Sequence, residues 1–489
     1  MNYQKKTKVD NAKARNWSIS IKRLIALSFL CSFLFCYPQN RKESNDIIFS
    51  GKITNVPTQL DGKKIISINT EFLLKGDTIY RKEIVLSDDG TFKVNISSGS
   101  GLYTLFDGTN ATRLFLRKSK RYEIDYNTKF FKNGKIQLVG ADTAINRYFV
   151  EKYQNRVFVD RDIKRSEEDY RQYLGNIKKQ QLQCLERSKL PTKLKQEEAK
   201  YIEYEYLYEL NIFLLMKGQI EPAFKPSKAS RDELSINYSN EQEYKKQHYY
   251  ASLVGDYYTI QKLSEIKREY KKKDSLYSVD QYIIKILDSL VPSQYIKNDL
   301  IRQITRFYLR QAKDKEAFFN DFKKYYTGHD SAFKQITYDN YLRLSKLKKG
   351  TPSPDFSNYQ NFNGGSNSLT DFRGKYVFID IWATWCAICW DELSYLKKLE
   401  KKHEGKNIVF VSLSWDKVES EWRKTIEKEN LTGVQLLAKG KDDPFLKAFA
   451  VTGIPRYIFL DPDGKIIDYN APRPSEKEKI QKLFNSAGL

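Results

Sequence analysis

Residues 382–389 read Trp-Ala-Thr-Trp-Cys-Ala-Ile-Cys and directly follow the apolar run from Tyr376 to Ile381. The run predicts a buried strand, and the residues from Trp390 to Lys402 are compatible with a helix. Cys386 is therefore expected at a helix N-terminus, where unpaired backbone N–H groups favour a thiolate over a thiol. The pattern predicts a redox-active pair. Cys386 is the attacking nucleophile, and Cys389, less open to solvent, is the resolving thiol.

A zinc site is the main alternative for two cysteines at this spacing, because such a pair often forms half of one. The other half would need two further Cys or His ligands at suitable spacing. Among the five cysteines and three histidines of the chain, the remaining ones form no second paired motif: Cys31, Cys36, Cys184, His248, His329 and His403. We therefore expect no metal, and no cofactor other than the Cys386–Cys389 disulfide.

Four motifs in the last third of the chain point to one family. They are Pro354-Asp355-Phe356, the stretch from Leu369 to Lys375, the stretch from Trp382 to Cys389, and Thr452-Gly453-Ile454-Pro455. From about Gly350 onward the chain resembles the TlpA/ResA-like branch of the thioredoxin family, the extracytoplasmic thiol-disulfide oxidoreductases. The apolar and helical patterns of this region give the order β, α, β, α, β, β, α, with a hairpin predicted by the turn Asp461-Pro462-Asp463-Gly464. This order matches the α/β thioredoxin fold that the resemblance implies, a central sheet flanked by helices.

The resemblance also implies a substrate site beside the cysteines. In this family the proline equivalent to Pro455 is cis and lies against the cysteine pair, which leaves the backbone of the preceding residue free to pair with an extended substrate. We expect substrate contacts at Trp385, Ile454, Pro455 and Arg456. Taken alone, Pro455 is better explained as an ordinary proline at the start of a strand, but the cysteine motif favours the family role.

Asp380 interrupts the apolar strand six positions before Cys386. The matching position in thioredoxin carries a buried Asp beneath the resolving cysteine. Burial raises the pKa of a carboxyl group, which suits it to exchange protons near neutral pH. The alternative is an Asp that points to solvent at a strand edge, but the apolar neighbours on both faces favour a buried strand. We therefore expect Asp380 to relay protons for Cys389.

The sequence departs from the family pattern beside the cysteines. Ala387-Ile388 stands between them where thioredoxins have Gly-Pro, Ser394 replaces a proline of many relatives, and Trp390 follows the resolving cysteine. The dipeptide between the cysteines tunes the reduction potential, so the sequence leaves that potential open. Trp390 is expected either to shield the site or to pack as an ordinary core aromatic.

The chain begins with a basic segment and an apolar run. Residues 1–23 carry seven Lys or Arg against one Asp, and the apolar run from Leu24 to Tyr37 follows. This order is typical of a signal segment, so we expect export to the periplasmic side of the cell envelope. Neither Cys31 nor Cys36 follows a small residue, as a lipidated cysteine would. Whether the segment is cleaved or retained as an anchor stays open.

At 489 residues the chain is expected to be multidomain. After residues 1–46, the alternating pattern and turns of residues 47–141 predict a small all-β domain, a sandwich or barrel-like unit. It is similar to the domain that often precedes TlpA-like domains in Bacteroidetes-type exported proteins. Residues 142–348 show apolar and tyrosine stripes at helical spacing, and residues 349–489 form the thioredoxin-like domain. Cys184 is expected to be a half-buried structural thiol.

The net charge of +23 raises the question of a nucleic-acid partner. Basic residues are interleaved with acidic ones and no nucleic-acid motif occurs, so we expect none. Attraction to anionic membrane lipid, lipopolysaccharide or acidic proteins fits the charge better, and a solvated surface fits it best. Membrane association is instead suggested by the apolar N-terminal segment, if it is retained.

Two functions from different classes fit the sequence. The first is an exported thiol-disulfide oxidoreductase that acts on protein thiols and disulfides, with reduction favoured and a membrane protein as electron donor. The alternative is a cell-envelope binding or scaffold protein whose thioredoxin domain is mainly structural. A peroxiredoxin is a third possibility, but it would need a Thr-x-x-Cys motif. Thr384 stands only two residues before Cys386, so we set this alternative aside.

Overall fold

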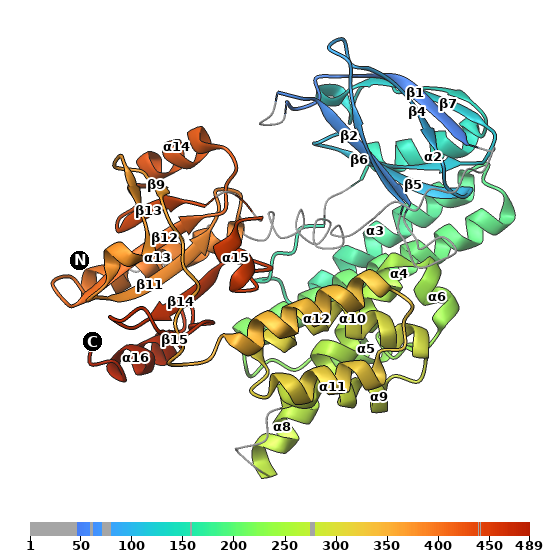
Figure 1. Ribbon diagram of the computed structural model, residues 1–489. Coiled ribbons are helices and arrows are strands. Elements are labelled where there is room, and N and C mark those ends of the chain that lie inside the picture. The colour runs from blue at the N-terminus through green and yellow to red at the C-terminus, as the bar shows by residue number, and fades with distance from the viewer. Residues whose placement is uncertain are drawn as a thin grey trace, which may run out of the picture. The chain divides into compact units, whose positions relative to one another are not determined.

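The computed structural model describes residues 46–58, 62–70, 80–156, 159–273, 279–438, 440 and 442–489 (Figure 1). The expected signal segment and its cysteines lie outside these residues. The chain forms two compact units that meet in sequence between Glu265 and Ile266. This boundary falls inside the region 142–348 that the sequence predicts to be helical. Among the described residues, no helix combines the length and the apolar character needed to cross a membrane.

The first unit begins with eight strands in two antiparallel-rich sheets. One sheet has the order β4-β1-β7-β8 and the other β3-β2-β5-β6. Apolar side chains from both sheets, such as Phe49 and Ile124 from one and Ile66 and Tyr103 from the other, share a single core. The predicted sheet-rich region is therefore confirmed, in its sandwich form. The strands are β1 Ile47–Thr54, β2 Ile65–Thr70, β3 Arg81–Val85, β4 Thr91–Ile96, β5 Gly101–Phe106, β6 Ala111–Leu116, β7 Arg121–Asn127 and β8 Gln137–Gly140.

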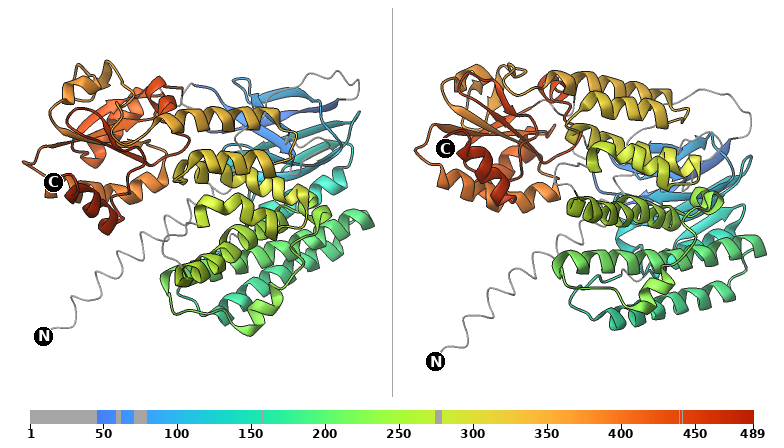
Figure 2. Two further views of the ribbon diagram at one scale, coloured as in Figure 1. Left: turned by 60° about the horizontal axis from the view of Figure 1, so that its bottom comes forward. Right: turned by 90° about the horizontal axis from the view of Figure 1, so that it is seen from below.

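Helices make up the rest of the first unit, and the longest two, α3 and α4, lie side by side (Figure 2). Ser166 caps α3 by accepting a hydrogen bond from the Asp169 backbone N–H at 3.1 Å, and three acidic residues occupy the first turn. The helices are α2 Thr143–Gln154, α3 Glu167–Arg187, α4 Thr192–Ile220, α5 Lys228–Glu233, α6 Glu241–Lys246 and α7 His248–Asp256, followed by a π-helical stretch at Tyr257–Lys262. Helix α8 Leu263–Lys273 spans the boundary between the two units.

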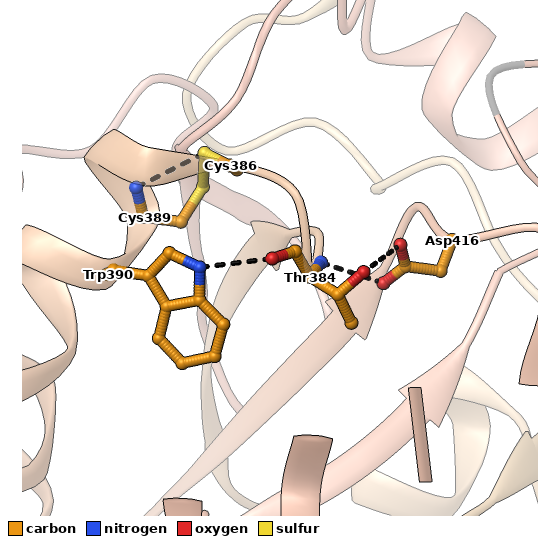
Figure 3. The surroundings of a disulfide bond; sticks show 5 residues. All are labelled: Thr384, Cys386, Cys389, Trp390 and Asp416. Carbon is orange, nitrogen blue, oxygen red and sulfur yellow. Dashed lines mark hydrogen bonds between the residues drawn. A yellow bond between two sulfur atoms is a disulfide. The ribbon is translucent and has the colours of Figure 1, made fainter. Parts of the chain in front are cut away.

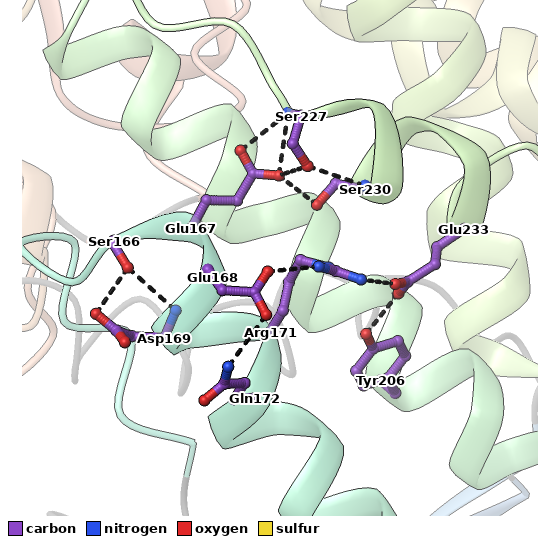
Figure 4. Close-up of polar contacts among 10 residues, drawn as sticks. All are labelled: Ser166, Glu167, Glu168, Asp169, Arg171, Gln172, Tyr206, Ser227, Ser230 and Glu233. Atoms are coloured by element: carbon purple, nitrogen blue, oxygen red, sulfur yellow. Dashed lines mark hydrogen bonds and ion pairs between the residues drawn. The ribbon is translucent and has the colours of Figure 1, made fainter.

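Polar side chains fasten the start of α3 to α4 and α5 (Figure 4). Arg171 pairs with Glu168 at 2.7 Å and also with Glu233 of α5. The Tyr206 hydroxyl of α4 donates to the same Glu233 carboxylate at 2.5 Å. Because each charged group in this cluster has a partner, we interpret the cluster as a structural clamp and not as a binding site.

The second unit opens with helices α9 Ile283–Leu290, α10 Gln294–Gln311, α11 Lys315–Tyr325 and α12 Ser331–Lys346. Together with α2–α8 they confirm a helical region between the two sheet-containing parts. Leu300 and Ile304 at helical spacing are buried, as their pattern predicts, whereas Phe307, which the same pattern includes, is exposed.

A seven-stranded mixed sheet follows, in the order β10-β9-β13-β12-β11-β14-β15. The central strand β11 pairs in parallel with β12 and antiparallel with β14. The elements are β9 Tyr359–Asn361, β10 Ser366–Asn367, β11 Tyr376–Trp382, α13 Ala387–Lys402, β12 Ile408–Ser414, α14 Glu419–Glu429, β13 Val434–Leu437, α15 Pro444–Ala448, β14 Arg456–Leu460, β15 Ile466–Asp468 and α16 Lys477–Asn485.

The predicted order of this region is wrong in one respect, because it lacks β9, β10 and β13. These strands have four residues or fewer, too few for an alternating pattern to stand out. The predicted β14–β15 hairpin at Asp461-Pro462-Asp463-Gly464 is present. Helices α13 and α16 share an apolar cluster with the sheet, built around Phe378, Leu396 and Phe484. This packing fixes α13, and with it the cysteine pair, against β11.

Candidate redox site

The two cysteines lie where the chain passes from β11 into α13. Cys386 is the N-cap of α13, and its Sγ accepts a hydrogen bond from the Cys389 backbone N–H at 3.1 Å (Figure 3). The two sulfur atoms form a disulfide. The predicted position of Cys386 at a helix N-terminus is therefore confirmed, although the helix starts at Ala387 and not at Trp390. The N–H bond to sulfur and the helix dipole both stabilise a Cys386 thiolate once the disulfide is reduced.

The two cysteines are shielded to a similar degree. Cys386 is 6% exposed and Cys389 is 9% exposed, so the expectation that Cys389 is the less open of the two is wrong for the oxidised form. The packing explains this, because both cysteines belong to one apolar cluster with Trp382 and Trp422. Position relative to the helix start, and not exposure, distinguishes the two thiols.

A buried carboxylate holds the loop that carries the nucleophile. Asp416 accepts hydrogen bonds from the Thr384 backbone N–H at 2.9 Å and from the Thr384 hydroxyl at 2.8 Å (Figure 3). It also accepts from the Ser414 hydroxyl at 2.7 Å. The Trp390 indole N–H donates to the Thr384 carbonyl oxygen at 3.0 Å. Trp390 also packs against the apolar cluster that contains both cysteines, and its hydrogen bond helps to hold the loop before Cys386.

Asp380 lies inside the sheet and not at its edge. It pairs with Ser412 of β12 on one side and with Tyr457 of β14 on the other. Burial is the main cause that raises the pKa of Asp380 to about 8, and the negative charges of Glu400 and Glu392 add to it. One carboxyl oxygen of Asp380 has no hydrogen-bond partner among the described residues. Asp380 is therefore able to change protonation state near neutral pH.

Asp380 and Cys389 line the same small cavity, together with Trp390, Lys397 and Glu400. Its volume of about 20 Å³ is sufficient for about one water molecule. A carboxyl group and a thiol on one such cavity can exchange a proton directly or through a single water. This arrangement is the one that the sequence predicted for Asp380.

Two further acidic residues influence the site and were missed in the sequence. Glu392 follows Cys389 by three residues on α13 and accepts from the Ser475 backbone N–H at 3.0 Å and from its hydroxyl at 2.7 Å. Glu400, two turns further along, lies in the cavity wall and also has a pKa raised by burial. Their signal was the helical spacing, since Glu392 follows Cys389 by three residues and Glu400 follows it by eleven, about three turns, which brings both near the helical face of Cys389.

The segment expected to receive the substrate lies in the same cluster as the cysteines. The Ile454-Pro455 peptide bond is cis, as the resemblance implies, and Ile454 packs against the cluster that contains Cys386 and Cys389. Trp385, next to the nucleophile, is 63% exposed. The exposed ring of Trp385 and the nearby start of β14 together form a surface. An extended peptide can bind to a surface of this kind.

Arg456 does not belong to this surface, which corrects the expectation of a substrate contact by its side chain. The residue is 2% exposed. Its guanidinium donates to Asn470 Oδ1 at 2.7 Å and to the Tyr469 carbonyl oxygen at 2.6 Å. Arg456 therefore holds the end of the β14–β15 hairpin. A basic residue after Pro455 looks accessible in the sequence, and only the packing of the hairpin shows that it is not.

Two further expectations concern the free cysteine Cys184 and a metal site. Cys184 is a free thiol on α3 and is exposed, so the expected half-buried position is wrong. Within the described ranges, no three His, Cys, Asp or Glu side chains are grouped so that they could hold a metal ion.

Comparison with known proteins agrees with this geometry. Residues 348–484 match the Redoxin family. The thioredoxin-like protein YneN of Bacillus subtilis (strain 168) is 33% identical over 140 residues, which are 28% of this chain and 79% of YneN. The thiol-disulfide oxidoreductase ResA of Bacillus thuringiensis subsp. konkukian (strain 97-27) is 28% identical over 127 residues, or 26% of this chain and 72% of ResA.

A solved structure is similar to the same region. The thioredoxin domain of a thiol-disulfide oxidoreductase from Bacteroides vulgatus is 30% identical and covers 29% of this chain and 98% of its own, with a TM-score of 0.26. On the sequence matches, the chain belongs to the thioredoxin-like family, with a Redoxin domain as its C-terminal region. The predicted relation to ResA-like proteins and the predicted enzyme class, thiol-disulfide oxidoreductase, are confirmed.

Proposed function

We propose that the protein is an exported thiol-disulfide oxidoreductase of the cell envelope that reduces disulfides in other proteins. The observation that carries the proposal is the Cys386–Cys389 pair at the start of α13, beside the cis Ile454-Pro455 bond. The redox reaction takes place in residues 349–489 and uses no cofactor apart from the cysteine pair.

The reaction begins with both cysteines reduced. The Cys386 thiolate attacks a substrate disulfide and forms a mixed disulfide, and the first substrate sulfur leaves as a thiolate. Cys389 then loses its proton and attacks the Cys386 Sγ. This step breaks the mixed disulfide, releases the second substrate sulfur and leaves the Cys386–Cys389 disulfide. Two electrons thus pass from the cysteine pair to the substrate, and a dithiol donor must restore the pair.

Asp380 is proposed to take the proton of Cys389 in the resolving step. The shared cavity brings the two groups to one small volume, and the raised pKa of about 8 makes the carboxylate of Asp380 a stronger base than an ordinary carboxylate. Trp385, Ile454 and Pro455 are proposed to contact the extended substrate, with backbone hydrogen bonds at Ile454 and an aromatic contact at Trp385.

Export and the electron donor are parts of the same proposal. The basic segment of residues 1–23 and the apolar run after it support translocation, with the bulk of the chain on the periplasmic side. A membrane protein would then supply electrons from the cytoplasmic side. The N-terminal segment would keep the protein at the membrane if it is retained.

Trapping of mixed disulfides tests the exchange reaction. In cells that express the full chain, Cys389→Ser should accumulate covalent adducts with other proteins, because the mixed disulfide on Cys386 cannot be resolved. Cys386→Ser should accumulate few, and Cys184→Ser, a control at a free thiol outside the site, should match the parent. Non-reducing gels of acid-quenched cells provide the measurement. Equal trapping by the two site variants, or none by either, would favour the scaffold alternative.

The reduction potential of the pair tests the direction. Equilibration with glutathione and dithiothreitol buffers, followed by alkylation and mass spectrometry of the Cys386–Cys389 peptide, gives this potential. We expect a value at or below about −250 mV, in the range of reducing thioredoxins. A value near about −120 mV, as in strong oxidants, would reverse the proposed direction but keep the enzyme class.

A further inference from the structure

A large cavity lies in the first unit, and no residue of the cysteine site lines it. It has a volume of about 640 Å³, which is within the range of about 300–1,000 Å³ of small-molecule sites. Its walls come from three helices: Arg147 and Tyr148 lie on α2, Ile177 and Arg187 on α3, and Tyr201 on α4. A site between packed helices is a common place for a ligand.

The charges of the cavity wall are unbalanced. Five basic and two acidic side chains line it: Arg147, Lys152, Arg156, Arg187 and Lys189 against Glu151 and Glu205. Clustered positive charges that are not neutralised by the protein attract an anion.

Ion pairs account for only part of the positive charge. Lys152 pairs with Glu198 at 2.6 Å, and Arg156 pairs with Glu205 at 3.1 Å. Arg147, Arg187 and Lys189 form no ion pair with any residue that the structure describes. Two of the cations are therefore part of the structural network, and three remain available to a ligand.

The rest of the wall adds apolar surface. Ile177 and the ring of Tyr148 line the cavity. The Tyr148 hydroxyl itself is enclosed, and burial followed by the negative charge of Glu198 raises its pKa. The aromatic ring and Ile177 are therefore the surface that the cavity offers to the apolar body of a ligand.

A second hollow on α3 provides a contrast. It has a similar volume of about 660 Å³, but its charged side chains are two basic and three acidic ones: Lys178, Lys179, Glu186, Glu203 and Glu233. Lys178 is paired there with Glu203 at 2.5 Å. The excess of positive charge thus belongs to the first cavity and is not general to α3.

We propose that the cavity between α2, α3 and α4 binds a small organic anion. Its apolar body lies against Tyr148 and Ile177, and its acidic group contacts Arg147 and Arg187. The site is independent of the thiol-disulfide chemistry, and neither function requires the other.

A pair of probes that differ only in charge tests this proposal on the full chain. Anilinonaphthalene sulfonate carries an aromatic body and an acidic group, and phenylnaphthylamine has the same body without the acidic group. We expect saturable binding of the sulfonate, and an affinity about tenfold weaker in the double variant Arg147→Gln, Arg187→Gln, because charged contacts are lost. Binding of the neutral probe should change by less than about twofold.

The matched control removes two exposed positive charges outside the cavity, Lys179→Gln and Lys193→Gln. Both probes should bind this control as they bind the parent. An equal loss of sulfonate affinity in the two double variants would overturn the proposal, because net charge alone would then explain it. Equal affinity of the parent for the two probes would overturn the anion preference. Far-UV circular dichroism checks that the variants, all changed at exposed positions, remain folded.

Alkylation of Cys184 tests the location independently. This exposed thiol lines the cavity, so a bound molecule should cover it. We expect saturating sulfonate probe to slow the reaction of Cys184 with iodoacetamide at least about threefold, read on the Cys184 peptide by mass spectrometry. An unchanged rate at saturation would place the probe elsewhere and overturn the assignment.

Discussion

Asp380 of β11 and Glu198 of α4 are both almost inaccessible to water, but their surroundings differ. Glu198 is 2% exposed and is held by Arg113 at 2.8 Å and by Lys152 at 2.6 Å. Asp380 is 8% exposed and forms no ion pair with a residue that the structure describes. Burial disfavours its charged form, and the negative charges of Glu400 and Glu392 disfavour it further. Removing a buried acid that is matched by cations leaves an uncompensated buried charge, whereas a buried acid among other acids is costly to ionise and is a candidate for proton transfer.

Two further buried acids show that the partners of a carboxylate, and not the domain in which it lies, decide how costly its charge is. Asp416 lies in the same Redoxin domain as Asp380 and is 5% exposed, but it receives hydrogen bonds from Thr384 and Ser414. Burial alone would raise the pKa of Glu205 in the first unit, but Arg156 and Lys152 outweigh burial and lower it. Asp380 is therefore exceptional among the buried acids compared here.

The largest expected effect is on stability, when the paired acid is removed. Glu198→Ala leaves both Arg113 and Lys152 without their carboxylate, and an uncompensated buried charge costs about 3–5 kcal/mol. We expect a loss near the upper end of that range, measured by urea unfolding followed by far-UV circular dichroism. Glu197→Ala, at the preceding position, is the control and should cost less than about 1 kcal/mol. A small loss in Glu198→Ala would mean that the buried network does not hold the first unit together.

Substitution of Asp380, the acid without an ion-pair partner, should raise the stability of the fold and not lower it. The pKa of Asp380 is raised from 3.8 to about 8 in the folded chain, so its contribution to stability is present below pH 4 and is lost as the pH rises toward 8. Asp380→Asn removes the titrating carboxyl group, and with it this loss of stability at higher pH. Relative to the parent, the variant should gain about 4 kcal/mol of unfolding free energy between pH 5 and pH 8, since each pH unit contributes about 1.4 kcal/mol.

Tryptophan fluorescence during urea unfolding measures this gain, because all the described tryptophans lie between residues 382 and 422. Glu404→Gln, at an exposed position of the same domain, should follow the parent at each pH. Asp380→Asn should also slow the resolving attack of Cys389 between pH 6 and pH 8, as seen by rapid quenching of a mixed disulfide. If the variant were more stable at pH 8 and equally fast, the proton-relay role would have to be withdrawn.

The smallest effect is expected at an exposed ion pair. Lys228 and Asp232 of α5 lie 2.5 Å apart, but their side chains are 82% and 61% exposed. Water and salt screen such a pair, so Asp232→Asn should change the unfolding free energy by less than about 0.5 kcal/mol. The same urea titration as for Glu198→Ala measures it. A loss comparable to that of Glu198→Ala would show that pairing alone, without burial, decides the stability of the first unit.

Local patterns in the sequence were sufficient to predict much of the Redoxin domain. The run from Tyr376 to Ile381 is a central strand, the Asp461-Pro462-Asp463-Gly464 turn joins two strands, and Cys386 lies at the start of a helix, as predicted. These features depend on neighbours within a few residues, for which apolar periodicity and turn chemistry are sufficient signals. The short strands β9, β10 and β13 were missed because they form only where a partner strand is already present.

The site itself could be predicted only in part. The sequence determined by itself which residues are the candidates for the chemistry: two cysteines one helical turn apart, and an acid in an apolar strand. It also determined the family, through motifs that are each local.

Only the tertiary structure decided which groups share a space. Glu400 influences Asp380, and Asp416 accepts a hydrogen bond from Thr384, although the members of each pair are far apart in sequence. The Arg456 side chain looks accessible in the sequence but is buried by the hairpin. The cavity with its unpaired arginines likewise exists only because α2, α3 and α4 pack together. Burial, charge balance and hydrogen-bond partners depend on long-range packing, and no local pattern of residues encodes them.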